Sequence, residues 1–126
     1  EAEAADLGSH LRVLIGGASQ GCCAAFDIFA RYPQPLGGFV GFVGHPLRST
    51  PIEGSRQRDV LCCFYNGAAD DTMRINWVRP AIGRLTSTGW SRVQLSVADE
   101  VDHGTSEEVE NEWMDNFLWH AFRSTP

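Results

Sequence analysis

The sequence contains no lysine, no excess of positive charge and no apolar run long enough to span a membrane. Its ten cationic residues are all arginines, and sixteen Asp and Glu residues bring the formal net charge to −6. Nucleic-acid binding requires a basic patch, so the acidic balance argues against it. A membrane-spanning helix needs roughly 18 or more consecutive apolar residues. We therefore expect neither a nucleic-acid partner nor a membrane span.

Cysteine is scarce, and its arrangement does not favour a metal site. The four cysteines form two adjacent pairs, Cys22-Cys23 and Cys62-Cys63, inside apolar segments. Metal sites favour spacings such as C-x2-C, so we expect no metal, and no motif calls for a cofactor. Free cysteine often behaves as a small buried hydrophobic residue, which is the simpler interpretation. A disulfide between the two pairs is the alternative, because secretion would permit it.

A length of 126 residues with 43% hydrophobic content predicts a single domain with a packed core. The first four residues, Glu1-Ala2-Glu3-Ala4, resemble the spacer that remains when a secretion leader is incompletely removed. We therefore assign residues 1–4 to an expression scar and residues 5–126 to the domain.

Strand and helix patterns alternate along the chain. Apolar runs predict strands over 11–15, 38–43, 60–65 and 92–98, and helical patterns cover 22–32, 73–86 and a last helix that begins at Ser106. The apolar face of that last helix comprises Val109, Trp113, Phe117 and Leu118. Such alternation predicts an α/β fold, a short parallel sheet of about four strands with flanking helices. The first strand is expected to be buried on both faces.

The segment Gly17-Ala18-Ser19-Gln20-Gly21 has the G-x-S-x-G form of a nucleophile elbow. The pattern means most where a strand enters it and a helix leaves it, and both conditions are met here. The glycines allow the sharp turn that raises the serine above the sheet. We interpret Ser19 as a nucleophile and the backbone N–H of Gln20 as an oxyanion donor, with a purely structural turn as the alternative.

An acid and a base follow in the order that α/β-hydrolases use, which is Ser, then Asp or Glu, then His. Asp70 lies just after the third predicted strand, and His103 lies just after the fourth. Carboxyl ends of parallel strands meet at one edge of a sheet, so Ser19, Asp70 and His103 should converge there. The neighbouring Asp71 is the alternative acid.

Other polar and aromatic residues have simpler interpretations. His45 follows the second strand and would be able to line the site, while Asp102 and Glu100 are expected to be solvated acids. His120 is expected to be partly exposed on the last helix. The four tryptophans (Trp77, Trp90, Trp113 and Trp119) are expected in the core or at its boundary.

Four segments, in order, resemble the phospholipase/carboxylesterase group of α/β-hydrolases, which includes the acyl-protein thioesterases. Residues 16–21 are similar to its G-G-x-S-Q-G elbow, and residues 35–41 to the strand that follows. Residues 66–70 resemble its H-G-x-x-D acid loop with Asn66 in place of His, and residues 101–104 resemble the loop of its catalytic His. The likeness extends from about residue 11 to residue 122.

The resemblance implies a truncated α/β-hydrolase fold, of which this chain forms the C-terminal half. It implies hydrolysis of small to medium acyl esters or thioesters through an acyl-Ser19 intermediate, and a cytoplasmic location. The family's second oxyanion donor comes from an earlier loop that this sequence lacks, and losing one donor costs on the order of 10²–10³ in rate. The first strand would also lose a neighbour, so its open edge is expected to pair with a second copy or with a missing N-terminal half.

Two alternatives stay open at this point. The first is that the chain is a catalytically weak hydrolase-like half that acts as a binding or interaction module. A flavodoxin-like domain with a coincidental elbow is less favoured, because no G-x-G-x-x-G arrangement follows the first strand.

Overall fold

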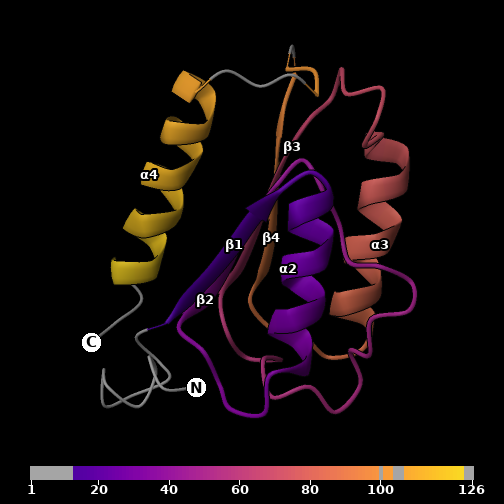
Figure 1. The fold of residues 1–126 in the computed structure, drawn as a ribbon, viewed down its shortest axis with the longest axis vertical. Coiled ribbons are helices and arrows are strands. Elements are labelled where there is room, and N and C mark those ends of the chain that lie inside the picture. Colours follow the sequence, from indigo (N-terminus) through magenta and orange to yellow (C-terminus); the bar gives the residue numbers. More distant parts are fainter. Residues whose placement is uncertain (1–12, 100, 104–106, 124–126) are drawn as a thin grey trace.

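The computed structural model describes residues 13–99, 101–103 and 107–123 of the protein. In these ranges the chain alternates between strands and helices (Figure 1). The elements are β1 (Leu14–Ala18), α2 (Gln20–Arg31), β2 (Gly38–Phe42), β3 (Cys62–Gly67), α3 (Ile75–Ser87), β4 (Val93–Ala98) and α4 (Glu107–Arg123). Ser106, the predicted start of the last helix, lies outside the described residues.

The four strands form one parallel sheet in the order β1-β2-β3-β4. Parallel neighbours require a crossover between strands, and α2 and α3 provide two of these connections. All carboxyl ends therefore lie at the same edge, at the top of Figure 1. The predicted α/β fold with about four parallel strands is confirmed.

Helices cover both faces of the sheet. Helices α2 and α3 lie on one face and α4 lies on the other (Figure 1). On the first face, aromatic side chains dominate the core, and the rings of Phe26 and Phe39 meet edge to face at 5.2 Å. On the second face, Trp113 of α4 stacks on Tyr65 at 5.6 Å, and Phe117 is fully buried. This confirms the apolar face predicted for the last helix.

The position of β1 corrects one expectation. The predicted strand over 11–15 was expected to be buried on both faces, but β1 runs over 14–18 and alternates between exposed and half-buried residues. In the described part of the chain its only neighbour is β2, so β1 is an edge strand and Leu14 is 42% exposed. Among the residues that the structure describes, the predicted open edge is therefore present. Its pairing with a second copy or a further segment stays a prediction.

Two other boundaries differ from the sequence expectation. Strand β3 continues through Asn66 and Gly67, which pair with β4, although an Asn-Gly pair is typical of a turn. Helix α3 begins at Ile75, two residues after the start of the predicted helix over 73–86, and Pro80 lies inside it. Proline removes the N–H that would bond to the carbonyl of Asn76, and the site is at the exposed surface, where water can replace this bond.

All four cysteines are buried free thiols, as the simpler interpretation predicted. Burial raises the pKa of Cys22 and Cys62 well above the ordinary thiol value, and it raises the pKa of Cys63 to about 11. The thiolate is the reactive form of cysteine, so these three residues are held in their unreactive form.

Candidate active site

Ser19 is the single residue between β1 and α2, and its backbone is strained. It has φ 54° and ψ −125°, a region that residues with a side chain rarely occupy. Hydrogen bonds hold the turn: its N–H donates to the carbonyl of Phe42 at 2.8 Å, and its own carbonyl accepts from the N–H groups of Cys22 and Cys23. Strain of this kind persists only where surrounding structure enforces it, and it is common at functional sites.

Close packing within the elbow explains one of its glycines. A Cβ atom at Gly17 would collide with the main chain of Gly21, so no larger residue fits there without a shift of the backbone. The strand and the helix thereby approach closely enough for Ser19 to sit directly at the carboxyl edge of the sheet.

The structure places the three predicted site residues in one chain of hydrogen bonds. Ser19 Oγ lies 2.8 Å from His103 Nε2, and His103 Nδ1 lies 2.9 Å from Asp70 Oδ2. An ionised carboxylate can only accept, so Nδ1 of His103 carries a proton and donates it. In the neutral imidazole, Nε2 is then the acceptor for the Ser19 hydroxyl.

Asp70 is buried and fully hydrogen bonded, with a side chain that has no exposed surface. Its Oδ1 accepts from the N–H groups of Thr72 at 2.8 Å and Met73 at 2.7 Å, while Oδ2 faces His103. Asp71, the alternative acid, is exposed at the surface. Asp70 is therefore the carboxylate that contacts the imidazole.

Asn66 anchors the loop that carries Asp70. Its side chain is completely buried, and Nδ2 donates to the carbonyls of Met73 at 2.9 Å and Gly67 at 3.1 Å. Its Oδ1 is buried without a hydrogen-bond partner among the described residues. In the sequence, Asn66 was notable only because it replaces the His of the family's acid loop. Its structural role was indicated only by the position of a single amide side chain at the end of an apolar strand.

Backbone hydrogen bonds join the loop of Asp70 to the loop of His103. The N–H of Ala69 donates to the carbonyl of Val101 at 3.2 Å, and the N–H of Ala68 donates to the carbonyl of Ala98. The side chain of His103 is 29% exposed, so one side of the imidazole faces solvent where a substrate would enter. Asp102 is exposed as expected, whereas Glu100 and the side chain of His120 lie outside the described residues.

Gln20 is the first residue of α2. The first N–H groups of a helix have no partner within the helix, so that of Gln20 is available to an oxyanion formed at Ser19. The same helix end carries a partial positive charge, which favours an anion there.

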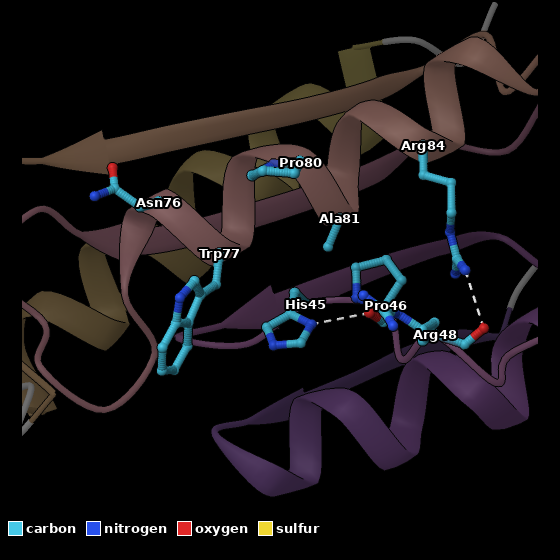
Figure 2. Close-up of a pocket in the computed structure, with 8 residues that line it drawn as sticks. All are labelled: His45, Pro46, Arg48, Asn76, Trp77, Pro80, Ala81 and Arg84. Carbon is cyan, nitrogen blue, oxygen red and sulfur yellow. Dashed lines mark hydrogen bonds between the residues drawn. The ribbon is translucent and has the colours of Figure 1, made fainter.

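A pocket of about 410 Å³ lies between the segment after β2 and helix α3 (Figure 2). His45 lines it, and Nδ1 of His45 donates to the carbonyl of Pro46 at 2.9 Å. Trp77 also lines it and is 57% exposed, which corrects the expectation of a core or boundary position. Trp119 is likewise 53% exposed, whereas Trp90 and Trp113 are buried.

The described residues contain no group of three His, Cys, Asp or Glu side chains arranged to hold a metal ion. No helix in the same ranges is both long and apolar enough to cross a membrane.

Solved structures share this architecture. Esterase PE8 superposes with a TM-score of 0.77 at 20% identity, covering 95% of this chain and 55% of that chain. Acyl-protein thioesterase 2 of Zea mays gives 0.71 at 20% identity, with 87% and 56% covered. SOBER1 of Arabidopsis thaliana gives 0.70 at 21% identity, with 93% and 58% covered. The chain has the α/β-hydrolase fold.

The similarity is one of fold and not of sequence. No family model and no curated protein matches this sequence. The three structures are α/β-hydrolases of the phospholipase/carboxylesterase type, so the resemblance seen in the motifs extends to the fold. The chain spans between 55% and 58% of their length, and the four strands and three helices of its described residues match that part of the fold.

Proposed function

We propose that the protein is a serine hydrolase that cleaves carboxylic esters or thioesters through an acyl-Ser19 intermediate. The observation that supports this most is the continuous chain of hydrogen bonds from Ser19 through His103 to Asp70, with distances of 2.8 and 2.9 Å. A serine hydroxyl is a weak nucleophile until a positioned base accepts its proton, and His103 is at the distance such a base needs.

In the first half-reaction, Ser19 Oγ attacks the carbonyl carbon while its proton moves to Nε2 of His103. The imidazolium that forms is stabilised by the carboxylate of Asp70. The tetrahedral oxyanion accepts a hydrogen bond from the N–H of Gln20. The bond to the alcohol or thiol then breaks, and His103 returns the proton to that leaving group, which leaves an acyl ester on Ser19.

In the second half-reaction, water attacks the acyl ester and gives a proton to His103. The tetrahedral intermediate collapses, the carboxylic acid leaves, and His103 returns the proton to Ser19 Oγ. Each proton that His103 accepts is donated again in the same half-reaction, so no cofactor is needed.

The surroundings of the site support this assignment. Two N–H groups occupy Oδ1 of Asp70, which leaves Oδ2 to hold one orientation of His103. Burial raises the pKa of Cys22, three residues after Ser19, so that this thiol does not compete as the nucleophile.

The structural neighbours support the same class. One is named an esterase and another an acyl-protein thioesterase. We assign ester or thioester hydrolysis to the present chain because the hydrogen bonds among Ser19, His103 and Asp70 suit this chemistry.

Hydrolysis of p-nitrophenyl butyrate tests the proposal, with Ser19→Ala as the key variant. We expect release of p-nitrophenol by the parent protein and only the uncatalysed rate with Ser19→Ala. Ser87→Ala, which alters an exposed serine at the end of α3, is the matched control and should keep the parent rate. Equal rates for the parent and Ser19→Ala would rule out the acyl-serine mechanism.

A further inference from the structure

The pocket beside α3 is lined by arginine, histidine and apolar side chains. Its walls come from the segment after β2 and from one side of α3 (Figure 2). The lining residues are His45, Pro46, Arg48, Asn76, Trp77, Pro80, Ala81 and Arg84. A volume of about 410 Å³ falls in the range of pockets that bind small organic molecules.

The pocket is basic although the protein is acidic. Two of its eight lining residues are arginines, one is a histidine and none is acidic. The ion pairs of the described residues are Arg31 with Asp27 and His103 with Asp70, so neither Arg48 nor Arg84 pairs with a carboxylate there. A protein with a formal net charge of −6 thus has, in one concave site, two guanidinium groups with no carboxylate partner among the described residues.

The guanidinium of Arg84 is held by carbonyl groups, which carry no charge to balance its own. Its Nη1 donates to the carbonyl of Arg48 at 3.0 Å, and its Nη2 donates to the carbonyl of Leu47 at 2.8 Å. Its Nε is buried and has no hydrogen-bond partner in the described part of the chain. Neutral carbonyls orient the guanidinium but leave its charge in place, and the two oxygens of a carboxylate match its planar donor geometry.

The remaining wall is apolar. Trp77, Pro80 and Ala81 of α3 face the loop residues across the pocket (Figure 2). The guanidinium of Arg74 lies 5.2 Å from the centre of the Trp77 ring, which adds another positive charge beside this wall. Such a combination suits a short carbon chain that ends in an anion.

Both walls continue from segments of the active site. A Cβ atom at Gly44 would lie 2.6 Å from Cβ of Cys22 and 3.0 Å from the carbonyl oxygen of Ser19, so Gly44 packs against the elbow. His45 is the next residue, about 3.8 Å farther along the chain. On the other side, the loop of Asp70 leads into α3 within five residues. One wall of the pocket therefore continues from a residue that packs against the elbow of Ser19, and the other continues from the loop of Asp70.

We infer that the pocket binds a carboxylate carried by the ester or thioester substrate. This inference rests on the proposed function and narrows it to substrates with a free carboxylate, in the acyl group or in the leaving group. A second pocket shares Arg48 and Arg84 but also contains Glu53, which would repel an anion. The carboxylate is therefore assigned to the first pocket, which has no acidic lining residue.

Binding is measured first, without catalysis. The Ser19→Ala protein is titrated with adipate, and amide shifts are followed by NMR, with neutral adipamide as the matched ligand. We expect saturable shifts at Trp77 and Ala81 with adipate and not with adipamide. Arg48→Gln should weaken adipate binding about tenfold, as expected for the loss of one charged contact. Arg56→Gln, the same change at an exposed arginine outside the pocket, should leave it unaltered.

Absence of saturable shifts, or equal shifts with adipamide, would overturn the carboxylate site whether or not the protein is an enzyme. A loss of binding in Arg56→Gln as large as in Arg48→Gln would overturn it as well, because it would reveal a general charge effect.

Kinetics then locate the carboxylate in the substrate. The acyl arm compares mono-p-nitrophenyl adipate with p-nitrophenyl hexanoate, and the leaving-group arm compares hexanoate esters of 4-hydroxyphenylacetate and 4-ethylphenol. The rate with Ser19→Ala is subtracted throughout. We expect kcat/KM to favour the charged member of one pair about tenfold, and Arg48→Gln to remove the preference. If the protein hydrolyses these esters without a preference in either pair, the inference is overturned and the proposed function stands. If it hydrolyses none of the four esters, the proposed function is contradicted, and the adipate titration alone decides whether the pocket binds a carboxylate.

Discussion

The imidazole of His103 and the carboxylate of Asp70 meet at 2.9 Å, although 33 residues separate them in the chain. Each lies just beyond the end of a strand, and β3 and β4 are neighbours in the sheet. Backbone hydrogen bonds between the two loops hold this distance. Ser19 follows β1, on the other side of β2, and reaches the same imidazole, so the ends of β1, β3 and β4 together build one site.

Replacing Asp70 by Asn should leave the fold intact and reduce kcat by roughly 10³–10⁴, because a neutral amide no longer stabilises the imidazolium. Asp71→Asn is the matched control and should keep the parent rate, since Asp71 is exposed. Hydrolysis of p-nitrophenyl butyrate and circular dichroism check both variants. A larger loss in Asp71→Asn would show that the neighbouring residue is the acid.

Asn66→Ala should destabilise the protein by about 1–3 kcal/mol, because the Asp70 loop would lose the two hydrogen bonds that the buried amide donates to the carbonyls of Gly67 and Met73. The free energy of unfolding in urea measures this effect. Asn111→Ala, at an exposed site on α4, is the control and should change stability by less than about 0.5 kcal/mol. Equal stability of Asn66→Ala and the parent would show that the amide does not hold the Asp70 loop.

The cysteines should react slowly in the folded protein. All four are buried, and burial raises the pKa of Cys22, Cys62 and Cys63, which stay protonated at pH 8. Labelling with Ellman's reagent should be slow in buffer and reach four thiols per chain in urea. Rapid labelling of the native protein at pH 8 would contradict this.

The same shifts give stability a pH dependence. These thiols have a higher pKa in the folded protein than the ordinary thiol value of 9.0, so above pH 9 the unfolded chain loses protons that the folded protein keeps. The free energy of unfolding should therefore fall between pH 8 and pH 10. A rise over this range would contradict the buried, protonated state.

The open edge of β1 is expected to promote association, because an unpaired strand edge offers hydrogen-bonding groups to another chain. Light scattering should show a mass that increases with concentration, and Leu14→Lys should reduce that increase. Ile28→Lys, which alters the 61%-exposed Ile28 on α2, should not. A monomer at high concentration would show that this edge does not drive self-association.

The sequence was sufficient for the parts of the site that depend on local pattern and chain order. A strand, a G-x-S-x-G turn and a helix predicted Ser19 at the sheet edge, and the order of later strands predicted Asp70 and His103 near it. The structure brings these three residues into contact. Their catalytic roles stay a prediction until activity is measured.

Features that depend on tertiary contacts were not predictable in the same way. Gly16 and Gly17 mark the end of a strand by local rules, yet pairing with β2 keeps them in β1. Trp77 is exposed in the pocket that the segment after β2 forms with α3. The periodicity of the sequence does not predict how these two segments are arranged. The role of Asn66 likewise depends on the fold of a loop that ends at Met73.

The most direct test is labelling of the protein with a fluorophosphonate, followed by mass spectrometry of the intact chain and its peptides. We predict one adduct per chain, located on Ser19, that is absent in Ser19→Ala and forms much more slowly in His103→Gln. Absence of an adduct in the parent protein, or a labelling rate unaffected by His103→Gln, would contradict an activated Ser19.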